Sequence, residues 1–280
     1  MAGGHMHGPH GGPGSRLGLE CAGVIDSAGP GVAGLRPGER VMATTNGAFA
    51  EYALCEAART LPIPDGVADD VAATFPVAIT TMHDAIVTNG GLQPGETIMI
   101  QGASSGVGLM GLQIAKLMGA GFVIGTSTNA ERRARLREFG ADLAVDTGDP
   151  AWPDLILAER PDGVHVTVDQ VSAGVSAGNL KAAAILGRIV NVGRLGGNKG
   201  EFDFDLHAMK RIRYIGVTFR TRSAEEVRDI VVKAKADLWP ALSAGKLRLP
   251  IDRRFPLDQA GEALAFMREN RHFGKIVLQA

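Results

Sequence analysis

The sequence predicts an α/β protein built on a doubly wound parallel sheet, with a second, smaller β-rich part. From about Ala72 onward, apolar segments of strand length alternate with helical segments, which is typical of a parallel sheet covered by helices on both faces. Between Leu17 and Thr81, short apolar runs are separated by Gly and Pro turns, which indicates a small β-rich barrel. With 280 residues, the chain is long enough for both parts.

The stretch from Thr97 to Ala120 carries the strongest functional motif. It opens with an apolar run of strand length, turns through Gly102–Gly108 (GASSGVG) and continues with apolar residues at helical spacing. Gly106 and Gly108 would let the backbone approach a pyrophosphate, and the N–H groups that open the following helix favour an anion. The strand, glycine turn and helix together predict a Rossmann-type dinucleotide site; an ordinary tight turn is the alternative.

The remaining elements follow from periodicity and turn signals. In the β-rich part, strands are expected at 19–25, 40–42 and 47–54. In the α/β part, further strands are expected at 121–126, 143–145, 164–168, 188–192 and 213–219. Helices are expected at about 77–87 and at 224–242, and the chain should close with a strand at 247–251, a helix at 257–268 and a strand at 275–278.

Composition and charge disfavour several function classes. The net charge is −1 with no basic or acidic block, so we expect neither nucleic acid nor a membrane surface as a partner. No apolar run approaches the ~20 residues of a membrane span, and the N-terminus lacks the pattern of a secretory signal. We therefore expect a cytoplasmic protein. Residues 1–16, rich in Gly and His, are expected to form a flexible tail.

The glycine turn also resembles that of short-chain dehydrogenases, but those enzymes need a Tyr-x-x-x-Lys pair. Neither Tyr52 nor Tyr214 is followed by Lys four positions later. The chain instead resembles the medium-chain dehydrogenase/reductase superfamily, in its zinc-independent quinone oxidoreductase (zeta-crystallin-like) and enoyl reductase branch. Besides the glycine turn, the stretches that carry this resemblance are Leu17–Gly23, Gly47–Tyr52, Leu92–Thr97 and His272–Leu278.

This resemblance implies a division of the chain into domains. Residues 17–81 plus 244–280 would form a partial GroES-like catalytic domain, and residues 82–243 a Rossmann dinucleotide-binding domain. The chain resembles relatives that begin roughly 45–55 residues earlier, so we expect an N-terminally short catalytic domain. One wall of the active-site cleft would then be missing.

The resemblance also allows zinc to be tested. A catalytic zinc needs three protein ligands, and zinc-dependent relatives carry Gly-His-Glu where this chain has Gly18-Leu19-Glu20. Leucine cannot bind a metal. Cys21 and Cys55 are too few for a four-cysteine structural site and are expected to be buried, small apolar residues. We therefore expect no metal, and the sequence identifies no catalytic residue.

The end of the second Rossmann strand indicates the cofactor. NAD-binding proteins carry an acidic residue there for the ribose 2′-OH, but this strand ends Gly-Thr-Ser-Thr-Asn with no carboxylate. Arg132 follows, where relatives carry a Lys or Arg that meets the 2′-phosphate of NADPH, and its planar guanidinium suits phosphate. NADPH is therefore the expected cofactor. The alternative is that Arg132 is one of four arginines on a solvated helix face.

By resemblance, further cofactor contacts fall on the glycine turn, on the ends of the next strands and on the turn beside the nicotinamide. Thr147 stands where many relatives have a Tyr against the adenosine, and the lysine of the closing Gly-Lys pair is a further candidate. The residues so implied are Thr81, Ser105, Gly106, Val107, Ser127, Asn129, Thr147, Val192, Gly193, Arg194 and Lys275.

Two classes of function remain open. The first is an NADPH-dependent oxidoreductase that transfers a hydride to a quinone or an α,β-unsaturated carbonyl, with an enoyl-thioester reductase as a variant. The second is an NADPH-binding protein or fragment with little or no turnover. The resemblance also implies a homodimer through the strand at 213–219, because an open sheet edge needs cover. Cover by the helix at 224–242 is the alternative.

Overall fold

The computed structural model of the protein describes residues 16–280, which form two compact units. The first unit contains the residues up to Thr80 together with Thr218–Ala280, and the second contains Thr81–Val217. The boundary near residue 81 agrees with the prediction within one residue. The tail predicted at 1–16 lies, apart from Arg16, outside the described residues.

The predicted end of the Rossmann domain at residue 243 is wrong, because helix α8 belongs to the first unit. This helix spans Ala224–Ser243 and begins at a capping box in which Ser223 and Glu226 satisfy each other's backbone N–H groups. It packs against the short 3-10 helix η1 (Ala57–Arg59), and Arg228 pairs with Glu56. The sequence pattern predicted the helix itself correctly but could not show which core its apolar face joins.

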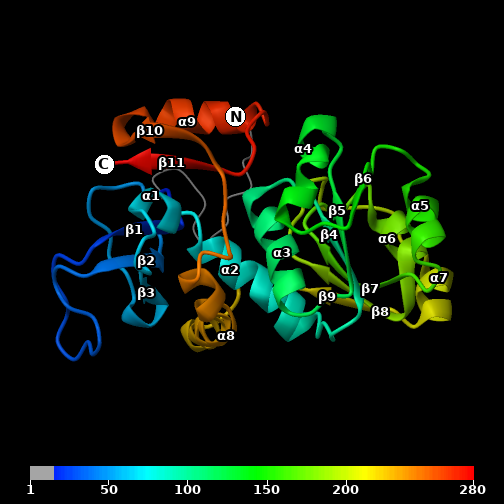
Figure 1. Cartoon of the computed structure of the whole chain (residues 1–280), viewed down its shortest axis with the longest axis horizontal. Helices are drawn as coiled ribbons and strands as arrows, with labels where there is room; N and C mark the ends of the chain where they lie inside the picture. Colours follow the sequence, from blue (N-terminus) through cyan, green and yellow to red (C-terminus); the bar gives the residue numbers. More distant parts are fainter. Residues whose placement is uncertain (1–15) are drawn as a thin grey trace. The chain divides into compact units, whose positions relative to one another are not determined.

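The first unit contains two small sheets (Figure 1). Its three-stranded antiparallel sheet has the order β1-β2-β3, with bounds Glu20–Val24, Arg40–Thr44 and Thr60–Pro62. A two-stranded parallel sheet joins β10 (Ile251–Pro256) to β11 (Lys275–Gln279). Its short helices are α1 (Asp69–Ala72), η4 (Leu257–Gln259) and α9 (Ala260–Arg268). Among the described residues these strands form two open sheets rather than the predicted barrel.

Two predicted strands of this unit are wrong. In the segment 47–54, only the first residues bond to the chain before β1, and Tyr52 and Leu54 are 78% and 92% exposed. The alternating pattern there has no packed face and no paired neighbour, so no ladder forms. In the segment 247–251, Leu247 and Leu249 are buried by packing, but strand pairing begins only at Ile251.

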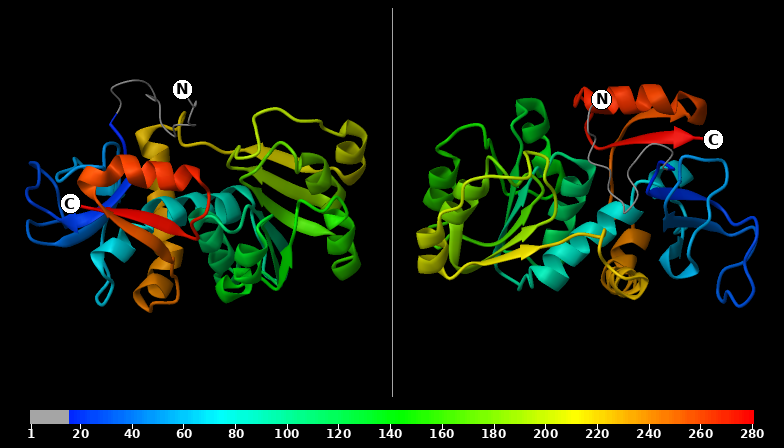
Figure 2. Two further views of the ribbon diagram at one scale, coloured as in Figure 1. Left: turned by 90° about the horizontal axis from the view of Figure 1, so that it is seen from above. Right: turned by 180° about the vertical axis from the view of Figure 1, so that it is seen from behind.

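The second unit is a six-stranded parallel sheet with the order β6-β5-β4-β7-β8-β9. Its strands are β4 (Thr97–Gln101), β5 (Phe122–Thr126), β6 (Leu143–Val145), β7 (Val164–Asp169), β8 (Ala183–Asn191) and β9 (Arg213–Gly216). The predicted doubly wound α/β class is confirmed. β9 is shorter than predicted and forms one edge of the sheet (Figure 2).

Helices cover both faces of this sheet (Figure 1). One face carries α3 (Gly106–Leu117) and the π-helix η2 (Asp84–Asn89), and the other carries α5 (Trp152–Glu159), α6 (Ser176–Ala182) and α7 (Phe204–Lys210). Helix α2 (Pro76–His83) leads into η2, and α4 (Ala130–Ala134) with η3 (Leu136–Phe139) follows β5. The single helix predicted at 77–87 is therefore an α-helix that continues as a π-helix.

A buried arginine ties η2 to the start of the central strand. The Arg188 guanidinium donates to the carbonyls of Gly90 and Gly91 at 2.8 and 2.9 Å, just beyond the end of η2. It also forms two hydrogen bonds with the Glu96 carboxylate, which directly precedes β4. Arg188 is 7% exposed, so these partners are held in a low-dielectric setting where removal of either charge is costly.

By length and composition, one helical stretch of the described chain, Asp69–Asn89, could cross a membrane. This corrects the expectation that no apolar stretch reaches that length. Its mean hydropathy is 1.2, and 67% of the window is buried inside the fold. Such burial is what the core helices of a globular domain show.

Candidate functional site

The glycine turn after β4 presents the N-terminus of helix α3. Gly102 adopts the left-handed conformation, with a φ of 69°, and starts the turn. Ser105 is the N-cap, and its Oγ accepts a hydrogen bond from the Gly108 N–H at 3.0 Å. The N–H groups of Gly106 and Val107 have no partner within the helix, because the first turn of a helix leaves them unpaired. Together with the helix dipole they can bind an anion.

Gly108 is needed for packing rather than for contact with a ligand. A Cβ at this position would lie 2.6 Å from the Gly102 carbonyl oxygen and 2.6 Å from the Ala103 Cα. Any side chain would therefore push α3 away from the turn. The sequence pattern assigned this glycine to pyrophosphate approach, whereas the structure gives it the task of seating the helix on the strand.

Polar side chains at the carboxyl ends of three neighbouring strands form a buried hydrogen-bond network. Gln101 ends β4, and its Nε2 donates to Asn179 Oδ1 at 2.7 Å while its Oε1 accepts from Thr126 Oγ1 at 2.7 Å. Thr126 Oγ1 also accepts from the Gly102 N–H at 3.1 Å, and Asn179 Nδ2 donates to Asp169 Oδ2 at 3.1 Å. The network ties the glycine turn to the ends of β5 and β7.

Asp169 organises the loop that follows β7. Its Oδ1 accepts from the N–H groups of Val171 and Ser172 at 2.8 and 2.9 Å, and its side chain is fully buried. Burial raises the pKa of Asp169 above its ordinary value, against the opposing effect of these two N–H groups. The carboxylate is therefore a structural acceptor held where charge is unfavourable.

Gln170 connects this loop to the glycine turn and to the turn after β8. Its Nε2 donates to the Gln101 carbonyl at 3.0 Å, and Ser105 Oγ donates to its Oε1 at 3.2 Å. Across from it, a Cβ at Gly193 would lie 2.6 Å from the Gln170 carbonyl oxygen, and the Val192 N–H donates to the Asp169 carbonyl at 2.8 Å. The structure thus brings the predicted turn at 192–194 next to the glycine turn.

The end of β5 lies beside the same turn. Ser127 is buried, and its Oγ is 3.0 Å from Ser104 Oγ. Asn129 caps α4 by accepting from the Arg132 N–H at 2.9 Å. Arg133, which was not predicted from the sequence, donates to the Ser127 carbonyl at 2.9 Å. It also pairs with the Asp146 carboxylate at 2.9 Å. Ser127, Asn129 and the backbone of Arg132 thus lie in one capped segment that follows β5.

The other predicted residues are less closely tied to this cluster. Thr147 follows β6 and is half-buried, and Thr81 lies half-buried on α2. Arg194 donates to the carbonyl of Val192, within its own turn, at 3.2 Å. Lys275 lies on β11 in the other unit, where its ammonium pairs with the Glu20 carboxylate.

The network residues Gln101, Asp169, Gln170 and Asn179 were not predicted. A signal was nevertheless present in the sequence, because apolar strands end in a polar residue at Gln101, Thr126, Asp169 and Asn191. Carboxyl ends of parallel strands meet at one edge of a sheet, so such residues can bond to one another. Asn179 carries no such signal, since it lies inside helix α6.

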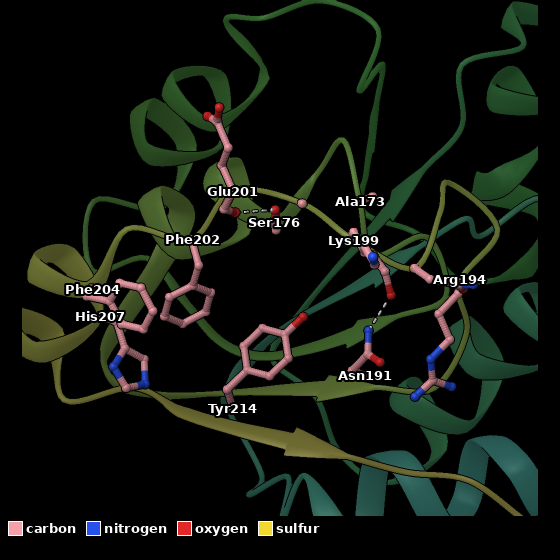
Figure 3. Close-up of a pocket in the computed structure, with 13 residues that line it drawn as sticks. Ala173, Ser176, Asn191, Arg194, Lys199, Glu201, Phe202, Phe204, His207 and Tyr214 are labelled. Atoms are coloured by element: carbon pink, nitrogen blue, oxygen red, sulfur yellow. Dashed lines mark hydrogen bonds between the residues drawn. The ribbon is translucent and has the colours of Figure 1, made fainter.

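A pocket of about 650 Å³ adjoins the turn after β8 (Figure 3). Asn191 and Tyr214 point into it, and Phe202 packs edge-on against Tyr214 with ring centroids 5.7 Å apart. Burial raises the pKa of Tyr214, so its hydroxyl stays protonated at neutral pH and can donate a hydrogen bond. The pocket offers aromatic surface together with a phenol and an amide.

Within residues 16–280, no three His, Cys, Asp or Glu side chains gather closely enough to hold a metal ion. Leu19, which stands where zinc-dependent relatives have a histidine, is partly exposed and supplies no donor atom.

The chain is similar to known proteins in sequence and in structure. The family profile "Zinc-binding dehydrogenase" matches residues 106–234, and the profile "Alcohol dehydrogenase GroES-like domain" matches residues 1–65. A mycocerosic acid synthase-like polyketide synthase of Mycolicibacterium smegmatis is 27% identical over 271 residues. This match covers 94% of the chain but 12% of the relative, so the chain spans only a small part of the curated relatives it matches.

Solved structures are similar over most of their length. A probable oxidoreductase from Mycobacterium abscessus is 30% identical with a TM-score of 0.82, over 96% of this chain and 81% of that chain. A mycobacterial protein complexed with NADPH is 25% identical with a TM-score of 0.82, over 94% and 82% of the two chains. A quinone oxidoreductase of Pseudomonas syringae is 25% identical with a TM-score of 0.81, over 95% and 82%.

The parallel sheet, the glycine turn at the N-terminus of α3 and these matches define a dehydrogenase-type fold, one solved example of which is complexed with NADPH. The chain belongs to the medium-chain dehydrogenase/reductase superfamily, and quinone oxidoreductases are among the structures it resembles. The resemblance expected from the sequence is thereby confirmed.

The raised pKa of Asp169 predicts how this residue affects stability as the pH changes. The folded state holds the proton more tightly than the unfolded state, so the contribution of Asp169 falls as the pH rises from 3.8 to the raised folded value. The free energy of unfolding of the wild type minus that of Asp169→Asn should therefore decrease across this window. Urea denaturation between about pH 4 and pH 8 measures this difference.

Asp154→Asn is the matched control, because Asp154 lies at the surface in an exposed pair with Lys181. Its difference from the wild type should stay small and nearly constant over the same range. A wild-type advantage over Asp169→Asn that grows with pH would show that the N–H donors outweigh burial.

Proposed function

We propose that the protein is an NADPH-dependent, zinc-independent oxidoreductase that reduces a quinone or an α,β-unsaturated carbonyl compound. The observation that carries the proposal is the assembled site at the carboxyl edge of the sheet. There the N-terminus of α3, the turn at 192–194 and a strand end without a carboxylate, Thr126–Asn129, lie side by side.

The residues present fit a dinucleotide. The unpaired N–H groups of Gly106 and Val107 suit the pyrophosphate, and Ser127 with Arg132 would hold the adenosine end. When bound, NADPH would supply the hydride that the reaction requires. The tightly packed turn at Val192 and Gly193 would set the position of the nicotinamide, since this backbone cannot shift without displacing Gln170.

The choice of NADPH rests on charge at the end of β5. Arg133 pairs with Asp146 at 2.9 Å, so the charge of this carboxylate, which follows β6, is compensated by a guanidinium of α4. No acidic residue stands between Thr126 and Asn129. The segment Thr126–Asn129 therefore contributes no negative charge that would repel a 2′-phosphate.

An enoyl-thioester reductase is the second candidate. It is favoured by the curated relatives, which are polyketide synthases that match 94% of this chain. Both reactions add a hydride to a carbon conjugated with a carbonyl group, and both leave an oxygen on which negative charge develops. Without a metal, hydrogen-bond donors of the protein or solvent must stabilise that charge.

Cofactor titration followed by substrate addition tests the proposal. NADPH and NADH are titrated into the protein by fluorescence, and 1,4-naphthoquinone or crotonyl-pantetheine is then added while NADPH oxidation is followed. We expect tighter binding of NADPH and steady oxidation with one substrate class, undiminished by a chelator. Binding without oxidation would instead support a cofactor-binding protein without turnover, and the absence of any binding would contradict the site itself.

Arg132→Ala should separate the two cofactors. Loss of a charged hydrogen bond to the 2′-phosphate should weaken NADPH binding by roughly 10- to 100-fold, with NADH binding changed by less than about 2-fold. Arg137→Ala is the control, because Arg137 is exposed on η3, the 3-10 helix that follows α4, and its loss should leave both affinities unchanged. Equal loss for NADPH and NADH would show that Arg132 has no role at the 2′-phosphate.

We also propose a homodimer through the edge strand β9. The neighbouring elements β8 and α7 expose large apolar side chains, with Leu186, Phe204 and Met209 each more than half exposed. Ile215→Lys should shift the mass measured by light scattering from dimer to monomer. Val232→Lys, which alters an exposed position on α8, should not. A wild-type monomer at working concentration would contradict the dimer.

A further inference from the structure

The only two cysteines of the chain lie next to each other. Cys21 and Cys55 are 34 positions apart in the sequence, yet their Sγ atoms are 3.8 Å apart. Both are free, and both are partly exposed rather than buried as the sequence suggested. Because the two residues belong to the same compact unit, this contact does not depend on how the two units are arranged.

The two cysteines differ in the backbone pairing of the segments that carry them. Cys21 is held within β1, where it pairs with Ala43 of the neighbouring strand. Cys55 follows the unpaired segment 47–54, which is fixed at this end by a hydrogen bond from Thr45 Oγ1 to the Leu54 carbonyl at 2.6 Å. The Cys21 sulfur, on a paired strand, thus faces the Cys55 sulfur, which directly follows a segment without strand pairing.

The local interactions favour a thiolate at Cys55. A hydrogen bond with the Cys21 thiol lowers the pKa of Cys55 to about 7, despite partial burial. The same hydrogen bond raises the pKa of Cys21, with burial and the adjacent Glu20 carboxylate acting in the same direction. Glu56, next to Cys55 in the sequence, is paired with Arg228. Near neutral pH, Cys55 is therefore partly in its nucleophilic thiolate form, whereas Cys21 retains its proton.

We propose that Cys21 and Cys55 form a reversible oxidation site that a peroxide converts into an intramolecular disulfide. The Cys55 thiolate attacks hydrogen peroxide, so an S–O bond forms, the O–O bond breaks and hydroxide leaves. The Cys21 sulfur then attacks the Cys55 sulfenic acid, and the S–S bond forms as the S–O bond breaks. Together, two thiols and one peroxide yield one disulfide and two waters.

The geometry requires only a small movement. A disulfide joins its sulfurs at about 2.05 Å, so the two Sγ atoms must approach by about 1.75 Å. Side-chain rotation and adjustment of the segment before Cys55 can supply this shift without moving β1. Closing the bond would link Cys55, which follows the segment 47–54, covalently to β1 of the three-stranded sheet.

Mass spectrometry of the full-length protein tests the proposal directly. After treatment with hydrogen peroxide and blocking of free thiols, the intact mass should show the loss of two hydrogens. Trypsin cleaves at Arg16, Arg40 and Arg59, so the peptides 17–40 and 41–59 should be recovered joined to each other. Dithiothreitol should separate them. Because the bond closes a loop of 34 residues, oxidation should also raise the melting temperature by roughly 5–10 °C.

Single serine variants identify the role of each sulfur. In Cys21→Ser, the Cys55 sulfenic acid should persist and be trapped by dimedone. In Cys55→Ser, Cys21 should react with peroxide more slowly than Cys55 does in Cys21→Ser, because burial and the adjacent Glu20 carboxylate still disfavour its thiolate. Neither variant should show the oxidation-dependent rise in melting temperature.

Three results would overturn the proposal. One is a disulfide found only between two chains on a non-reducing gel, and another is independent oxidation of both cysteines to sulfinic acids. The third is the absence of any joined peptide while Cys55 in the Cys21→Ser variant still reacts. None of these outcomes bears on NADPH binding or turnover, so the inference fails or stands separately from the proposed function.

Discussion

The buried hydrogen-bond network at the carboxyl ends of β4, β5 and β7 is the constraint on which the site depends. Gln101, Thr126, Asp169 and Asn179 are each at most 1% exposed, so none can exchange its partner for water. A buried polar group left without a partner costs about 1–3 kcal/mol, and such groups polarise one another. The loops attached to these strands are therefore fixed together, and the N-terminus of α3 keeps its position relative to the turn after β8.

Close packing of backbone reinforces this constraint where side chains are absent. At Gly108 and Gly193, backbone atoms of a neighbouring segment lie so close that a Cβ would be only 2.6 Å from a carbonyl oxygen. One of these contacts seats the helix on its strand, and the other seats the turn at 192–194 on the loop after β7. The loops of the site are therefore held in place both by side-chain hydrogen bonds and by close backbone contacts at the two glycines.

Much of this arrangement could be predicted from the sequence, for identifiable reasons. Parallel strands buried on both faces have apolar patterns that stand out, and the glycine turn lies directly between a strand and a helix. The failures concern features that depend on distant partners. The alternating segment at 47–54 needs a neighbouring strand that the described chain does not supply. The packing of α8 on η1 and the hydrogen bond from Gln101 to Asn179 join residues far apart in the sequence.

The electrostatics at the end of β5 show why the charge pattern of a sequence is insufficient for a cofactor assignment. Asp146 directly follows β6, and the sequence alone shows it only as a carboxylate next to Thr147, a predicted cofactor contact. In the fold it pairs with Arg133, which also donates to the Ser127 carbonyl, so its negative charge is compensated where the strand ends. The strand end itself, Thr126–Asn129, carries no carboxylate. The cap at Asn129 fixes the start of α4, and Arg133, within this short helix, is the arginine that pairs with Asp146.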